Sequence, residues 1–194
     1  MKLFYTGATK FLDAQPLPYK SLGGNISSSQ IPNHLEGNLF DSISKYTIWN
    51  TKGMEYRAIG ILNDGAATLT GLKVWVVWNS SEDSDSNNID SQYAEIGLGY
   101  QSPIADSCGD ISIELLPTAQ SRPYNTTLVE TYTSQGAALT LPDIEPGMYL
   151  GLFISRRLLP VTKQPLSQDA MESIASGELE LAPLENFDLY FSWT

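Results

Sequence analysis

The sequence predicts an all-β protein: an antiparallel β-sandwich with an extended N-terminal arm and one or two short helices. Two observations favour this fold class. Short runs rich in β-branched and aromatic residues recur along the 194 residues, and clusters of Gly, Pro, Asn and Asp separate them. Patterns with the period of a long helix are few. A chain of this length buries one good core, so we expect a single sandwich domain.

The clearest pair of strands lies near the middle of the chain. Residues 55–62 (EYRAIGIL) are rich in β-forming residues and end at the turn signal Asn63-Asp64-Gly65. Residues 72–78 (LKVWVVW) follow at the distance of a second hairpin arm. We therefore expect these two segments to pair as an antiparallel hairpin, with Asp64-Gly65 at the tip of its loop.

Residues 72–78 are largely apolar on both faces of the predicted strand. Alternation puts Val74 and Val76 on one face, with Trp75 and Val77 on the other. A strand of this kind is either buried on both sides or covered by a neighbouring chain. Trp75 is therefore a candidate contact residue.

Six further segments have the pattern of a strand. They are residues 92–98, 111–115, 128–133, 137–141, 148–155 and 187–193. The last segment alternates, and the residues predicted to point inward are Phe187, Leu189, Phe191 and Trp193. Short helices are predicted after the capping residues Asn33 and Ser167.

Residues 1–33 are predicted to be an extended arm, and residues 34–194 the sandwich domain. Pro, Gly and Ser separate the apolar positions of the arm, so no regular element there is long enough to build a core. Two arrangements stay open, alone or together along different parts of the arm: the arm adds a strand to the sheet edge of a neighbouring chain, or it wraps its own sandwich and covers an edge strand. In the first arrangement, deletion of residues 2–30 leaves the sandwich folded. The apolar residues predicted to contact another chain are Leu3, Phe4, Tyr5, Phe11 and Leu12.

The chain is strongly acidic, with 22 Asp and Glu against 11 Lys and Arg and a net charge of −11. This balance disfavours nucleic acid as a partner, because phosphate binding needs clustered basic side chains. The first 35 residues carry three Lys and one Asp, so this arm either docks on the acidic body of another copy or the body charge serves solubility alone. No apolar run has the length of a membrane span, and the first residues do not match a secretory signal. We expect a soluble protein made in the cytoplasm, with no membrane partner.

The chain has few of the residues that usually form a catalytic nucleophile and its base. Cys108 is the only cysteine and His34 the only histidine, so a nucleophile beside a base is not expected. Glu178 and Glu180 share one face of an extended segment, but a chain with 22 acidic residues contains such pairs by chance. Residues 97–99 (GLG) lack the rest of a dinucleotide fingerprint. We expect no catalytic residue and no cofactor.

The acidic loop of residues 79–90 (NSSEDSDSNNID) is the one segment with a pattern like that of a metal site. Asp83, Asp85 and Asn87 have the every-second-residue spacing of a calcium loop. The sixth position of that loop is not glycine, and the acidic residue of the twelfth position comes one place late. A solvated surface loop without a metal is therefore the prediction.

Arg156 and Arg157 end the apolar segment 148–155. Guanidinium groups at this place either hold an acidic neighbour or form an exposed strand end. With Trp75, they complete the set of candidate contact residues in the body of the chain.

Six short motifs follow one another in a characteristic order along the chain. They are KLFYTGA; SLGG and ISSS before IPN; NLFDSIS before YT; EYRAIGILNDGAATLTGLKVWV; GMYLGLFISRRLL; and FDLYFSW. In this order they resemble a family of virion structural proteins of tailed bacteriophages, the crAss-like phages and their relatives. The likeness runs along nearly the whole chain.

This resemblance implies a building block of the virion, with an immunoglobulin-like sandwich, an N-terminal arm and no catalytic motif. The implied function is that of a neck, collar or tail ring subunit, which would act as a connector at the head–tail junction. The implied partners are other copies of the chain in a ring or lattice, and portal, neck, tail or capsid proteins of the same virion. Two alternatives stay open: a capsid decoration protein, and a carbohydrate-binding sandwich that uses exposed aromatic residues such as Trp49, Trp75 or Tyr100.

Overall fold

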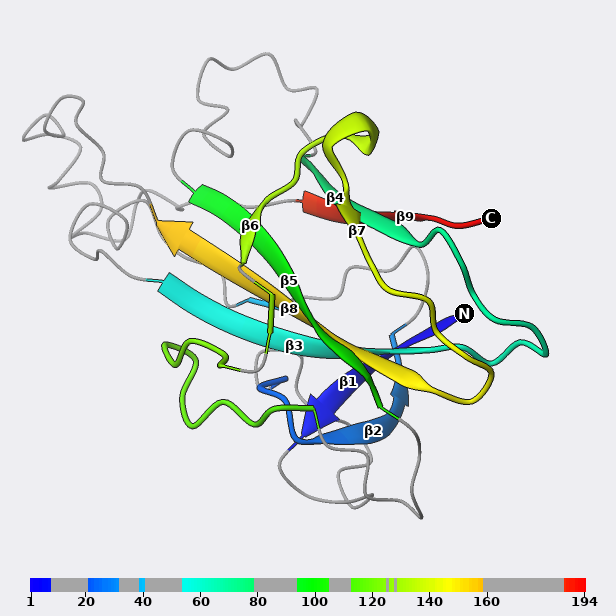
Figure 1. The fold of residues 1–194 in the computed structure, drawn as a ribbon. Coiled ribbons are helices and arrows are strands. Elements are labelled where there is room, and N and C mark those ends of the chain that lie inside the picture. Colours follow the sequence, from blue (N-terminus) through cyan, green and yellow to red (C-terminus); the bar gives the residue numbers. More distant parts are fainter. Residues whose placement is uncertain are drawn as a thin grey trace, which may run out of the picture.

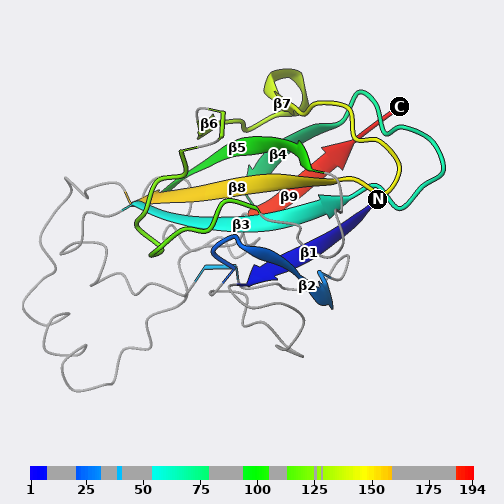
Figure 2. The same cartoon turned by 60° about the horizontal axis from the view of Figure 1, so that its bottom comes forward.

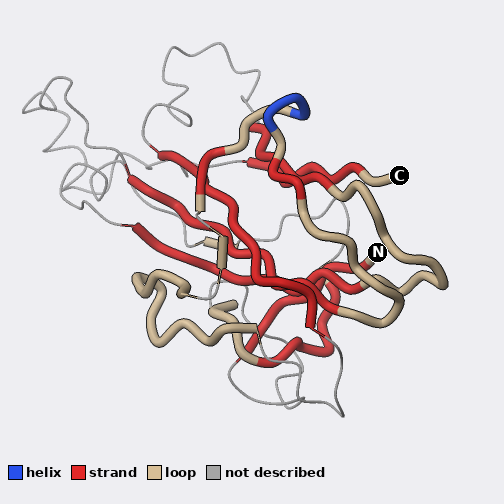
Figure 3. The backbone as a smooth tube through the Cα atoms, viewed as in Figure 1, coloured by secondary structure: helices blue, strands red, loops and turns tan. Residues whose placement is uncertain are grey.

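The computed structural model describes residues 1–7, 21–31, 39–40, 54–78, 94–104, 113–124, 126–127, 129–158 and 187–194. Within these residues the chain forms nine β-strands and one short 3₁₀ helix, Gln135–Ala137 (Figures 1 and 3). The strands are β1 (Lys2–Gly7), β2 (Asn25–Gln30), β3 (Met54–Leu62), β4 (Lys73–Trp78), β5 (Ala94–Ile104), β6 (Glu130–Thr131), β7 (Leu139–Thr140), β8 (Tyr149–Leu158) and β9 (Phe187–Ser192).

The strands form two antiparallel sheets. One has the order β2-β1-β3-β8-β5-β6, and the other has the order β7-β4-β9. Figure 2 shows β4 and β9 behind β5, β8 and β3, in a second layer. Side chains from both sheets meet in one core. The predicted all-β, antiparallel architecture is therefore confirmed.

The main core fills the space between the two sheets. Alternate residues of β3 and β8 face it, because successive side chains of a strand point to opposite faces. Val74 and Val76 of β4 face it from the other layer and are 0% and 1% exposed, as their alternation predicts. Phe40 also lies in this core. The remaining members from the long strands of the six-stranded sheet are Ile59, Ile61, Ile96, Leu98, Leu150, Leu152 and Ile154.

A second apolar cluster covers the opposite face of the six-stranded sheet. Ala58 and Phe153, which alternate with main-core residues along β3 and β8, pack there with Ile26 and Ile113. The Ile26 side chain approaches Gly60 so closely that a Cβ at Gly60 would collide with it. The middle parts of the central strands are thus buried on both faces, which explains their consecutive apolar residues, such as those of Leu152 to Ile154.

The predicted hairpin of residues 55–62 and 72–78 is wrong. β3 belongs to the six-stranded sheet and β4 to the three-stranded sheet, so the two strands do not pair. Residues 63–72 cross between the layers instead, and on the way Leu69 exchanges two backbone hydrogen bonds with Ile144, 2.9 and 3.1 Å long. Hairpin loops are commonly about two to five residues long, whereas this longer connection reaches the other sheet and buries Leu69 in the core.

The described residues of the predicted N-terminal arm are strands of the chain's own sheet. β1 pairs with β3, in register from Lys2 to Tyr5, and its other edge pairs with β2. This is the second of the two arrangements that the sequence left open, because β1 covers the edge of β3. In the described residues, β1 and β2 thus belong to the same sheet as β3 of the predicted sandwich domain, and the division of the chain between residues 33 and 34 stays a prediction.

A buried pair of hydroxyl groups fastens the segment before β2 to β1 and β3. Thr6 and Ser21 are both 0% exposed, and their hydroxyls donate to the backbone oxygen of Ala58 at 2.9 and 2.6 Å. In return, Thr6 Oγ1 accepts a hydrogen bond of 2.8 Å from the backbone N–H of Gly23. The Ser21 hydroxyl accepts one of 2.9 Å from the backbone N–H of Thr6. These polar residues are typical of a loop in the sequence, and here their hydrogen bonds satisfy buried backbone groups.

Most of the other predicted strands are present with changed lengths. β5 and β8 continue beyond the predicted residues 92–98 and 148–155, whereas β6 and β7 have two residues each. Of the predicted strand 111–115, the structure describes residues 113–115, and among these Ile113 makes a single bridge to Gly24.

β9 alternates as predicted over most of its length. Phe187, Leu189 and Phe191 pack against the main core, and Tyr190 is 46% exposed on the other face. The inward prediction for Trp193 is wrong, since its side chain is 53% exposed. β9 ends one residue before Trp193, so the alternation of the strand no longer directs this side chain.

Candidate assembly surface

The face of the three-stranded sheet that points away from the core carries aromatic side chains. It is called here the outer face, and it consists of Lys73, Trp75 and Val77 of β4 with Asp188, Tyr190 and Ser192 of β9. The register of the two strands pairs each of these β4 residues with one β9 residue. Its alternation follows directly from the inward positions of the core residues on the same strands.

Trp75 and Tyr190 form the centre of the outer face. They are directly opposite each other in the register, and their rings stack with centroids 5.8 Å apart and planes at 25°. Offset stacking of this kind contributes about 0.5–1.5 kcal/mol beyond the area that it buries. The stack fixes both rings in place while Tyr190 keeps 46% of its surface exposed. The outer face is therefore a preformed aromatic surface.

The charged residues of the outer face flank this stack. Lys73 lies opposite Ser192 on one side of the stack, and Val77 lies opposite Asp188 on the other side. Charges of both signs at the rim of an aromatic centre are typical of protein contact surfaces.

The structure does not bring the predicted contact residues together. Leu3 packs against the main core, and Phe4 packs with the second cluster, where its ring centroid is 6.3 Å from that of Tyr149. Tyr5 is 8% exposed, and its burial raises the pKa of its hydroxyl. These three residues stabilise the chain's own sheet, while Trp75 lies on the other sheet.

Arg156 and Arg157 have different environments although they are neighbours. Arg156 is 2% exposed and donates from its Nη2 to the carboxylate of Glu55 at 2.6 Å, so it is not an exposed strand end. The acidic neighbour that it holds belongs to its own chain. The Arg157 side chain is 58% exposed and lies 3.5 Å from the carboxylate of Glu95. Of the two, only Arg157 is accessible to a partner.

A buried arginine on the inward face of β3 has no counterpart in the predictions from sequence. Arg57 is 2% exposed, and its Nε donates to the backbone oxygen of Leu39 at 3.1 Å. The guanidinium groups of Arg57 and Arg156 both lie near the Phe40 ring, 5.0 and 4.8 Å from its centroid. The sequence indicates the burial of Arg57 only through strand alternation: Arg57 and Ile59 are two residues apart, so they lie on the same, inward face of β3.

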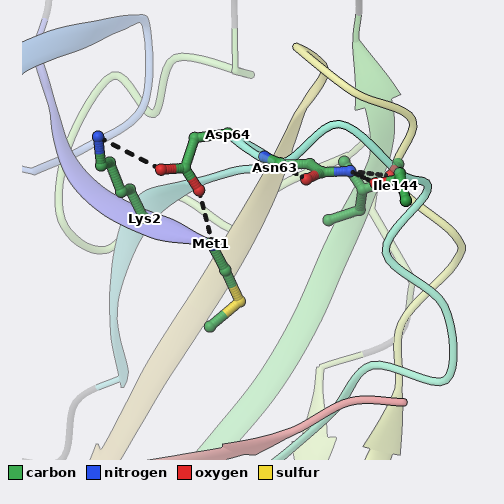
Figure 4. A network of polar contacts seen from close by, with 7 residues as sticks. Met1, Lys2, Asn63, Asp64 and Ile144 are labelled. Carbon is green, nitrogen blue, oxygen red and sulfur yellow. Dashed lines mark hydrogen bonds and ion pairs between the residues drawn. The ribbon is translucent and has the colours of Figure 1, made fainter.

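At the other end of β3, a network of polar contacts joins the start of β1 to the crossing segment (Figure 4). The Asp64 carboxylate lies 2.7 Å from the N-terminal ammonium group of Met1 and 3.3 Å from Nζ of Lys2. The hydrogen bond from the N-terminal ammonium is the main cause that holds the pKa of Asp64 below its usual value, with the Lys2 ammonium adding to the effect. Beside it, the Asn63 amide donates to the backbone oxygen of Ile144 at 2.7 Å. This network joins β1 to the crossing segment and the crossing segment to Ile144.

Of the three aromatic residues named as candidates for stacking on a sugar, the structure describes Tyr100 and Trp75. Tyr100 packs against the main core instead of presenting its ring to a ligand. Trp75 is half-buried, with its ring stacked on Tyr190. The candidate residues and segments that lie outside the described residues are Phe11, Leu12, Asn33, His34, Trp49, Cys108, Ser167, Glu178, Glu180 and residues 79–90. Their predicted roles stay predictions.

The described ranges contain neither a cluster of metal ligands nor a membrane-spanning helix. Among these residues, no three His, Cys, Asp or Glu side chains gather as metal ligands would. Within the same part of the chain, no helix combines the length and the apolar character that a membrane span requires.

Comparison with known proteins found no relative of the chain. No protein-family model, no curated protein and no solved structure matches it.

Proposed function

We propose that this protein is a non-enzymatic structural subunit of a tailed bacteriophage virion, in a neck, collar or tail ring at the head–tail junction. The structural observation that carries the proposal is the outer face, where the Trp75 and Tyr190 rings stack on neighbouring strands. The sequence resemblance to virion structural proteins supports the assignment to a phage particle.

An aromatic stack on a sheet surface suits repeated assembly. Aromatic side chains are enriched at the centres of protein interfaces, where they bury a large area at a small cost in side-chain entropy. The outer face also rests on a rigid support, because Val74 and Val76 hold the other side of β4 in the main core. A ring subunit needs such a preformed surface, since the cost of ordering it would be repeated in every copy.

The proposal also specifies the type of β-sandwich. Two antiparallel sheets over a common core support an immunoglobulin-like sandwich, which is the module that the resemblance implies. The partners are then other copies of the chain and the portal, neck, tail or capsid proteins of the same virion, with no role for nucleic acid or membrane. Phe11 and Leu12 are proposed to add contacts to a neighbouring chain.

The experiment uses a phage whose genome encodes this chain, with its own gene disrupted and variants supplied by the host. Particles purified on a density gradient are analysed by mass spectrometry and imaged by electron microscopy. The unaltered chain is expected in the particles, in a ring at the head–tail junction. The double substitution Trp75→Ala and Tyr190→Ala is expected to abolish incorporation, while Tyr124→Ala, on a different surface, is expected to incorporate normally.

Different results would contradict different parts of the proposal. A chain that is made in infected cells but absent from purified particles is not a virion subunit. Density on the capsid surface would favour a decoration protein. Normal incorporation of the double variant would exclude the outer face as the assembly surface.

A further inference from the structure

A hollow on the molecule lies away from the outer face and has no part in the proposed assembly. Its volume is about 550 Å³, and it is lined by Pro117, Ser121, Arg122, Pro123, Tyr124, Thr126 and Thr127. This size falls in the range of ordinary small-molecule sites, about 300–1,000 Å³. The lining combines one cation, one phenol ring and three aliphatic hydroxyl groups.

The segments that line the hollow are held by hydrogen bonds. Between the lining residues Pro117 and Ser121, the backbone oxygen of Ala119 accepts a hydrogen bond of 2.6 Å from the backbone N–H of Tyr56, which ties this part of the chain to β3. The lining residue Thr127 is joined to Tyr100 of β5 by a backbone hydrogen bond of 2.9 Å. Within the lining, the backbone N–H of Tyr124 donates to the Glu114 carboxylate at 2.6 Å. The hollow is therefore preformed, which lowers the cost of binding a ligand.

Two of the hydroxyl groups that line the hollow, those of Thr126 and Thr127, keep hydrogen-bonding capacity. The Thr126 hydroxyl donates to the backbone oxygen of Tyr100 at 2.7 Å, which leaves its oxygen able to accept. The Thr127 hydroxyl accepts from the backbone N–H of Tyr100 at 2.9 Å, which leaves its proton able to donate. A neighbouring acceptor and donor match the hydroxyls of a sugar, each of which both donates and accepts.

The rim of the hollow adds a ring and a positive charge. Tyr124 is 93% exposed, and an exposed aromatic ring is a platform for the apolar face of a pyranose. Arg122 is the only Lys or Arg between Lys73 and Arg156, and no carboxylate in the described ranges forms an ion pair with it. A single guanidinium in an otherwise acidic stretch selects a carboxylate, which it binds through two parallel hydrogen bonds.

We propose that this hollow binds a carbohydrate that carries a carboxylate, such as a sialic or uronic acid, with Arg122 on the carboxylate and Tyr124 against the sugar ring. The site is independent of the assembly function, because the hollow and the outer face share no residue. On a virion, such a site would attach the particle to acidic glycans.

The test measures binding to the purified full-length chain by calorimetry or by NMR titration. The probes are 3′-sialyllactose and methyl α-glucuronide, and their neutral counterparts are lactose and methyl α-glucoside. At least one acidic probe is expected to bind at up to about 10 mM, at least about tenfold more tightly than its neutral counterpart and more weakly as salt is raised.

Matched variants locate the site. Arg122→Gln and Tyr124→Ala are each expected to weaken binding of the acidic probe at least about tenfold, since each removes one of the two main contacts. Arg157→Gln removes an exposed cation elsewhere and is expected to leave binding unchanged. Failure of both acidic probes to bind, equal binding of neutral and acidic probes, or full binding by Arg122→Gln would each overturn the proposal. Circular dichroism of each variant checks the fold, and none of these outcomes bears on virion incorporation.

Discussion

Arg57 and Arg156 place their guanidinium groups over the same aromatic ring, 5.0 and 4.8 Å from the centroid of Phe40. Both arginines are only 2% exposed, so two like charges are buried beside one ring. The negative face of an aromatic ring attracts such cations, and the attraction grows when water is excluded. Phe40 thereby links the segment 39–40 to the two central strands β3 and β8.

The first prediction concerns Phe40 itself. Phe40→Ala is expected to lower the free energy of unfolding by about 3–5 kcal/mol, because it opens a cavity in the main core and uncovers two buried arginines. Phe40→Leu keeps much of the apolar volume and is expected to cost about 1–2 kcal/mol. Urea denaturation measures both. An Ala variant as stable as the Leu variant would show that the ring has no such role.

The second prediction compares two ion pairs on the same two strands. Glu55→Gln is expected to lower the free energy of unfolding by about 1–3 kcal/mol, because it removes a carboxylate that pairs with the buried guanidinium of Arg156. Glu95→Gln removes the partner of the exposed Arg157 and is expected to change it by less than about 0.5 kcal/mol. Thermal and urea unfolding of both variants check the difference. Equal effects would contradict the burial of Arg156.

The third prediction is a pH dependence at Asp64. Its pKa is lowered from the usual value of 3.8 in the folded state, so its contribution to stability is present above that value and is lost as the pH falls through the folded pKa. The melting temperature of the native chain should therefore exceed that of Asp64→Asn near neutral pH, and the gap should close below pH 3.8. A gap that stays constant from neutral to acid pH would exclude the ion pair as its cause. Added salt should narrow the gap, because these charges lie near the surface.

The fourth prediction tests the buried hydroxyl of Thr6. Thr6→Val keeps the shape of the side chain but leaves the backbone N–H of Gly23 without its acceptor. An unsatisfied buried donor costs about 1–3 kcal/mol, and that is the expected loss of stability in urea unfolding. Thr6→Ser keeps the hydroxyl and should lose clearly less. If Val is tolerated as well as Ser, this hydroxyl does not fasten residues 21–23.

The fifth prediction reverses an expectation for the N-terminal region. Deletion of residues 2–30 removes β1 and β2, exposes the edge of β3 and removes Ile26 from the second cluster. The truncated chain is expected to unfold or to lose several kcal/mol of stability, because it loses buried apolar area as well as strand pairing. A melting curve close to that of the full chain would restore the view of residues 1–33 as a separate arm.

The residues of β4 and β9 that face the core could be predicted from the sequence, because their positions follow from local alternation. Val74, Val76 and the core-facing residues of β9 were identifiable because an apolar side chain at every second position needs only one buried face. The outward position of Tyr190 followed from the same rule. The second apolar face of β4, to which Trp75 belongs, was identifiable for a related reason, and its role as a contact surface stays a prediction.

The choice of strand partners did not follow from local patterns. The turn signal at Asn63-Asp64-Gly65 is real, and the Gly65 N–H donates to Asn63 Oδ1 at 2.9 Å. The signal specifies a change of direction but not the sheet that the chain enters next. The stacking of Trp75 on Tyr190 depends on such long-range pairing, and so do the hydrogen bonds that join Ala119 to Tyr56 and Thr127 to Tyr100 beside the hollow.

The crossing of residues 63–72 between the two sheets has a consequence for the order in which the protein folds. Because β3 does not pair with its neighbour β4, its partners come from the beginning of the chain and from far along it, as in the pairing of Glu55 with Arg156, 101 positions apart. Contacts between such distant positions close large loops, and proteins dominated by them refold slowly, in about milliseconds to seconds. During synthesis, the edge of β3 that pairs with β8 therefore stays unpaired until β8 has left the ribosome.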